Sequence, residues 1–74
     1  MDPVILDIIK SFESKSKSKS QKYRDFLAYV YSTFDKKINL CKAIKLKNKY
    51  IKMRQSALEY IIVNEKDIKN KIYK

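Results

Sequence analysis

The stretch YRDFLAYVYSTF, residues 23–34, decides the fold class of this 74-residue chain. Its apolar side chains recur three and four positions apart, which is the period of one face of an α-helix. They are Tyr23, Phe26, Leu27, Val30, Tyr31 and Phe34. We therefore predict an amphipathic helix over residues 21–34, with Ser20 as its N-cap and with Asp35-Lys36-Lys37 interrupting the pattern. Tyr29 lies off this stripe, and we expect it to face solvent or an interface.

A shorter pattern precedes this helix. Apolar residues between Val4 and Phe12 recur at helical spacing behind Asp2-Pro3, a favourable helix start, and they predict an amphipathic helix over residues 3–13. Residues 14–20 read SKSKSKS, and because this segment has no apolar member it predicts a mobile linker. The chain therefore divides into an N-terminal helix (1–13), a Ser/Lys linker (14–20) and a helical core domain (21–74).

Residues 38–72 carry a second, longer helical pattern. We predict two helices, about 38–54 and 57–72, separated at the Ser-x-x-Glu capping box that Ser56 begins. A break at residues 64–67 and one continuous helix remain as alternatives, since neither Gly nor Pro marks a break. The apolar side expected to face the core consists of Leu40, Ile44, Ile51, Leu58, Ile61, Ile62, Ile68 and Ile72.

These patterns predict an all-α fold, a small bundle of three to four helices. The order of elements also allows a helix-turn-helix arrangement, with residues 21–34 as support, residues 35–37 as the turn and residues 38–54 as the recognition helix. A core of this size supplies only about 3–5 kcal/mol of net stability.

The residue inventory argues against catalysis and metal binding. The chain has no His, no Gly and a single Cys, Cys41. It therefore lacks a proton shuttle for neutral pH, a glycine-rich phosphate loop and a zinc ligand set. We expect no enzymatic activity, no cofactor and no metal. A single thiol fits an intracellular location, cytoplasmic or in the nucleoid or nucleus, and no apolar run approaches the ~20 residues that span a bilayer.

The charge points to a polyanion. Lys and Arg number 18 against 8 acids, and residues 36–54 hold no acid at all. Four lysines recur within this segment at the spacing of one helix face, namely Lys42, Lys45, Lys49 and Lys52. This face predicts binding of DNA or RNA, mainly through phosphates. The alternative is a solvated lysine surface on an A/T-biased gene. The candidate nucleic-acid-binding residues are Lys36, Lys37, Lys42, Lys45, Lys49, Lys52 and Arg54.

A second apolar stripe lies on another side of the same segment. It consists of Leu46, Tyr50, Met53, Ala57 and Tyr60. We expect the N-terminal helix to cover it, with a second copy of the chain as the alternative, and we predict a weak homodimer. The stripe also sets the alternative function, an adaptor or inhibitor that docks Leu46, Tyr50, Met53 and Tyr60 on a partner protein. A helix lying on a membrane surface is less favoured, because residues 36–54 contain no Trp or Phe.

Overall fold

The computed structural model describes residues 3–13 and 15–73, and within these ranges the chain forms four α-helices and no strand. The predicted all-α bundle is confirmed. The helices are α1 (Pro3–Ser11), α2 (Lys19–Leu40), α3 (Ile44–Val63) and α4 (Glu65–Ile72).

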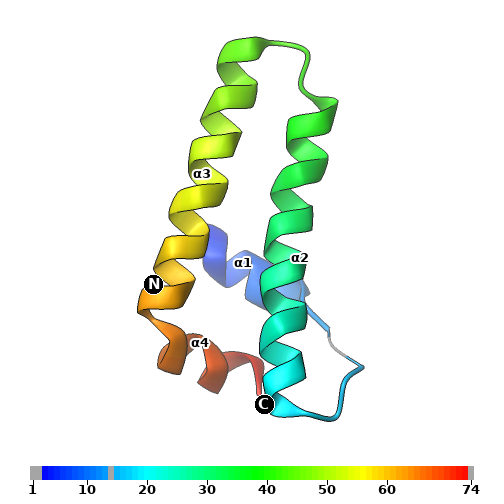
Figure 1. Cartoon of the computed structure of the whole chain (residues 1–74), viewed down its shortest axis with the longest axis vertical. Coiled ribbons are helices and arrows are strands. Elements are labelled where there is room, and N and C mark those ends of the chain that lie inside the picture. The colour runs from blue at the N-terminus through cyan, green and yellow to red at the C-terminus, as the bar shows by residue number, and fades with distance from the viewer. Residues whose placement is uncertain (1–2, 14, 74) are drawn as a thin grey trace.

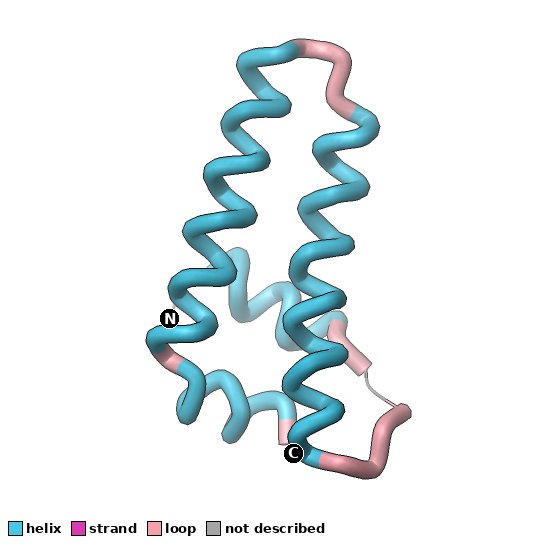
Figure 2. The backbone as a smooth tube through the Cα atoms, viewed as in Figure 1, coloured by secondary structure: helices cyan, strands magenta, loops and turns pink. Residues whose placement is uncertain are grey.

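The two long helices form an antiparallel hairpin (Figure 1). A short connection, residues 41–43, joins α2 to α3 at one end of a molecule that measures 39 × 22 × 16 Å. The short helices α1 and α4 lie against the opposite half of the hairpin, as the backbone trace also shows (Figure 2). The half that carries the connection consists of α2 and α3, with α1 reaching its inner edge, and we call it the loop end.

The core lies where all four helices meet. Phe26 and Val30 of α2 are fully buried, and the ring of Phe12 meets Phe26 edge-on at a centroid distance of 5.2 Å. This arrangement is the one that aromatic rings prefer, and it fastens the N-terminal segment to the hairpin. The buried cluster consists of Ile5, Ile8, Phe26, Val30, Phe34, Ala57, Ile61 and Ile68.

The predicted end of the second helix is wrong. Residues 35–37 lie inside α2, which continues to Leu40. Ile38 follows Phe34 by four residues and is buried, so the apolar face continues through the charged triplet. The helix-turn-helix arrangement built on a turn at 35–37 is therefore not what the chain adopts.

The predicted break at Ser56 is also wrong, because Ser56 lies in the middle of α3. The break falls instead at Asn64, within the alternative range 64–67. Both the backbone N–H and the side-chain amide of Asn64 donate to the carbonyl oxygen of Tyr60, at 3.0 and 2.9 Å. Glu65 and Asp67 then occupy the first turn of α4, where the helix dipole favours acids.

Only part of the predicted inward side of residues 38–72 faces the core. Ile61 and Ile68 are buried, and Leu58 and Ile72 are half-buried. The remaining members are exposed: Leu40 (83%), Ile44 (76%), Ile62 (63%) and Ile51 (38%). The physical reason is that the side of α3 facing the core lies between the two stripes, with Ala57 and Met53 from one and Ile61 and Leu58 from the other.

The N-terminal region follows the prediction with shifted ends. The first helix ends at Ser11, two residues earlier than predicted, and Ser18 rather than Ser20 is the N-cap of α2. Residues 15–18 are not helical, whereas Asp2 and Ser14 lie outside the described residues.

Two tyrosines of α2 differ in their surroundings. Tyr29 lies at the interface with the N-terminal segment, where its ring is 5.5 Å from that of Phe12. Tyr31, predicted to belong to the apolar stripe, is instead 47% exposed. The side of α2 that faces the core is therefore shifted around the helix axis, toward Tyr29 and away from Tyr31.

Candidate nucleic-acid interface

The loop end gathers the positive charge of the molecule. Residues 36–54 hold eight of the 18 cationic residues and none of the 8 acids, so the remaining cations are nearly balanced by acids. Seven lysines in this segment have exposed side chains, and we call them the loop-end lysines. They are Lys36, Lys37, Lys42, Lys45, Lys47, Lys49 and Lys52.

Both helices and their connection contribute to this set. Lys36 and Lys37 lie near the end of α2, and Lys42 lies in the connection rather than on a helix. The helical stack predicted for four lysines therefore holds for three of them, Lys45, Lys49 and Lys52, all on α3. The sequence prediction thus identified a helix face, whereas the fold brings lysines from two helices to one end.

These lysines repel one another. Lysines three or four residues apart on a helix destabilise it by a few tenths of a kcal/mol per pair, and Lys49 stands in this relation to both Lys45 and Lys52. The first turn of α3 adds to the unfavourable field, because it contains Lys45, no acid and no side-chain cap on its N–H groups. An anion at this end would relieve both effects.

Arg54 has two partners within the chain, an acid and an aromatic ring. One of its guanidinium nitrogens lies 3.5 Å from a carboxylate oxygen of Asp35, and the guanidinium lies 4.2 Å from the ring centroid of Tyr31. Its side chain is 19% exposed. Arg54 therefore links α3 to α2, and its charge is already offset by Asp35.

Cations at the opposite end are also engaged. Lys69 of α4 forms an ion pair with Glu65 at 3.1 Å, and its ammonium lies 4.9 Å from the ring centroid of Tyr23. The hydrogen bond to Glu65 raises the pKa of Lys69. Burial, followed by the negative charge of Glu65, raises the pKa of Tyr23. Both shifts belong to the contact of α4 with α2, and not to the loop end.

The predicted protein-interface residues are covered only in part within the chain. Met53 and Tyr60 pack against the core cluster, to which α1 contributes Ile5, and the groove described below separates α1 from the rest of this stripe. Tyr50 is half-buried, with the ammonium of Lys37 5.9 Å from its ring centroid. Leu46 is 42% exposed. The weak homodimer stays a prediction.

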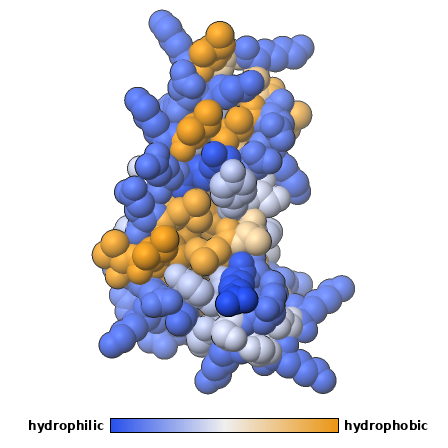
Figure 3. Space-filling model, viewed as in Figure 1, coloured by the Kyte–Doolittle hydropathy of each residue, from blue (hydrophilic) through white to orange (hydrophobic). Residues whose placement is uncertain are grey.

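Sequence reasoning missed two exposed apolar pairs. Leu40 and Ile44 flank the connection at the loop end, and Ile62 and Val63 end α3, with Val63 82% exposed. Apolar patches separated by hydrophilic surface are visible along the hairpin in Figure 3. The helical period alone assigned three of these four residues to the core.

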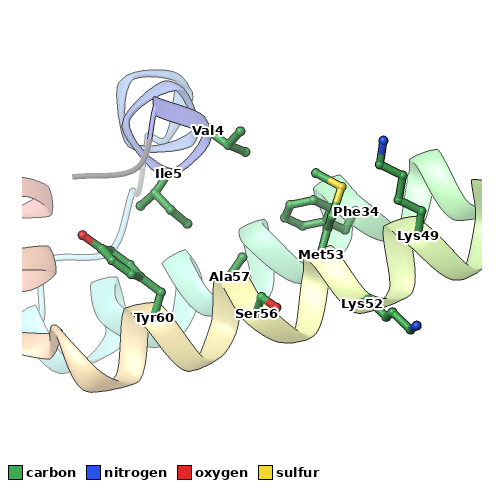
Figure 4. Close-up of a pocket in the computed structure, with 9 residues that line it drawn as sticks. All are labelled: Val4, Ile5, Phe34, Lys49, Lys52, Met53, Ser56, Ala57 and Tyr60. Carbon is green, nitrogen blue, oxygen red and sulfur yellow. The ribbon is translucent and has the colours of Figure 1, made fainter.

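A groove of about 440 Å³ was also not foreseen. It opens between α1 and the α2–α3 hairpin, and its close-up shows Lys49 and Lys52 at one end and Tyr60 at the other (Figure 4). Its lining residues are Val4, Ile5, Phe34, Lys49, Lys52, Met53, Ser56, Ala57 and Tyr60.

Comparison with protein families, with curated proteins and with solved structures found no match to this chain. Among the described residues, none of the helices combines the length and the apolar character needed to cross a membrane. The same residues contain no group of three or more Cys, Asp or Glu side chains arranged to hold a metal ion.

Proposed function

We propose that this protein binds nucleic acid, and that the loop-end lysines contact the phosphate backbone. The observation that carries this proposal is the gathering of seven exposed lysines, without an acid among residues 36–54, at one end of an elongated molecule. Their mutual repulsion is offset when phosphates replace the counterions around them.

The spacing of the lysines suits a nucleic-acid strand. Lys45 and Lys52 are separated by about 10 Å along the helix axis, given a rise of 1.5 Å per residue. One strand of duplex DNA places a phosphate about every 3.4 Å along its axis, so that about three phosphates fall within this distance. Lysine acts as a mobile point charge and reads bases less well than arginine, which favours backbone contacts with little sequence preference.

The proposal is tested first on the purified protein. We expect nucleic acid to copurify at low salt, seen as a raised ratio of absorbance at 260 nm to that at 280 nm, and to be removed by a high-salt wash. We also expect a fluorescein-labelled duplex to bind at 50 mM salt in a fluorescence anisotropy assay. Absence of binding to both duplex and single strands at 50 mM salt would contradict the proposal.

A second candidate function is docking on a partner protein, and the exposure of Leu40 (83%) and Ile44 (76%) favours it. These residues lie at the loop end and pack little against their own chain. Met53, by contrast, is a poor choice for testing a docking surface, because it packs against the core cluster.

We predict that the double variant Leu40→Ser with Ile44→Ser binds duplex DNA within about twofold of the original protein, because phosphate contacts are electrostatic. Its helical circular dichroism should be unchanged, since exposed positions contribute little to stability. Anisotropy and circular dichroism check both points. A loss of duplex binding by a folded double variant would contradict a purely electrostatic contact with phosphates, because it would show that Leu40 and Ile44 themselves contribute to binding the duplex.

A further inference from the structure

The groove beside α1 continues the lysine surface into an apolar cavity. Met53 and Phe34 form its middle, while Val4 and Ile5 of α1 point toward α3 from above it in the close-up (Figure 4). Its volume of about 440 Å³ lies in the range of small-molecule sites. The groove therefore has room for one flat aromatic group.

The cations of the groove are part of the proposed phosphate surface. Lys49 and Lys52 both line the groove and belong to the loop-end lysines, and no acid lines it. Lys49, Met53 and Tyr60 follow one another at intervals of four and seven residues, which places them on one face of α3. About 16 Å of helix axis separates Lys49 from Tyr60. The charged and apolar parts thus lie in one line along α3.

We propose that this groove takes one unstacked base of a single-stranded nucleic acid while Lys49 and Lys52 hold the phosphates next to it. This inference rests on the proposed function and adds a preference for single strands. Apart from the two lysines, the polar side-chain atoms of the lining are the hydroxyl groups of Ser56 and Tyr60. A base inside a duplex remains stacked and paired, so that entering such a groove costs the energy of flipping it out. A single-stranded base avoids most of that cost.

The test uses three fluorescein-labelled probes with the unmodified protein. They are a twelve-nucleotide oligothymidylate, an abasic strand with the same number of phosphates, and a twelve-base-pair duplex. We expect the oligothymidylate to bind about tenfold more tightly than the abasic strand at equal salt, because contacts between a base and protein side chains come on top of the phosphate contacts. Equal affinity for the two strands would overturn the inference but leave the proposed function standing. Failure of all three probes to bind would overturn the proposed function itself.

A matched pair of variants tests whether a base of the bound strand enters the groove. Ser56→Leu adds apolar bulk at a groove-lining position, whereas Gln55→Leu makes a comparable change at an adjacent exposed residue outside the groove. We expect Ser56→Leu to reduce oligothymidylate affinity toward that of the abasic strand without altering duplex affinity, and Gln55→Leu to change neither. A Ser56→Leu protein that is folded by circular dichroism and still prefers oligothymidylate about tenfold would place the base elsewhere.

Discussion

Replacing Lys45, Lys49 and Lys52 together by Gln should weaken duplex binding on the order of 100-fold at 50 mM salt. Each lysine that contacts a phosphate releases a counterion, so its removal flattens the plot of log affinity against log salt concentration by about one unit. The triple variant should therefore have a salt slope about three units shallower than the original protein. Fluorescence anisotropy at several salt concentrations measures both quantities.

A second triple variant separates local contacts from net charge. Lys10, Lys66 and Lys71 are exposed and lie on α1 and α4, away from the loop end. Changing them to Gln removes the same total charge, so their loss affects only the long-range field that salt screens. We expect this control to lose much less than tenfold in affinity. If it loses as much as the first variant, the phosphates are not held at the loop end.

Replacing Phe26 by Ala should unfold the protein at room temperature. Phe26 is fully buried and contacts Phe12 edge-on, so that truncation leaves a cavity where α1 meets the hairpin. Changes of Phe to Ala in a core cost about 3–5 kcal/mol. This equals the net stability of about 3–5 kcal/mol that a chain of this size has. Circular dichroism should show the loss of helical signal and of a cooperative thermal transition.

Ile62→Ala is the matched control for the core variant. Ile62 lies on α3 but is 63% exposed, so its truncation should change the free energy of unfolding by less than about 0.5 kcal/mol. Urea titration followed by circular dichroism measures the difference. A control as destabilised as Phe26→Ala would mean that Ile62 is covered, for example by a second copy of the chain.

The apolar period predicted the α2 face well because one stripe dominates residues 23–34. It underestimated the length of α2, although Ile38 stands four residues after Phe34 and continues the same face. The three charged residues between them face outward or sideways on the helix, and charge alone does not end a helix. A Gly or Pro would have been a stronger stop signal, and none occurs there.

The sequence alone did not determine which side of α3 faces the core. Two apolar stripes run along this helix, and the positions of α1 and α2 decide which members of each are buried. The helical period assigned Ile44 and Ile51 to the core, but both are exposed, on the side of α3 that faces away from Met53 and Ala57. The end of α3 is capped by Asn64, whose side-chain amide donates to the carbonyl oxygen of Tyr60, and neither a Gly nor a capping box marks this position in the sequence.

The candidate site was predictable in part. Burying an unpaired charge costs free energy, so the sequence correctly predicted that these lysines are exposed. The ion pair between Arg54 and Asp35 forms because α2 and α3 lie side by side. The two residues are far apart in the sequence, so the sequence pattern did not predict this pair. The groove was hidden for the same reason, since Ile5 and Ala57 meet there across most of the chain length.

The most direct measurement of the central claim is the salt dependence of duplex affinity for the original protein. Between 50 and 200 mM salt, we predict a slope of about −4 to −5 in log affinity against log salt concentration, for four to six phosphates neutralised. Affinity should then fall on the order of 10²–10³-fold over this range. A flat response would contradict phosphate binding by the loop-end lysines, whatever affinity is found at a single salt concentration.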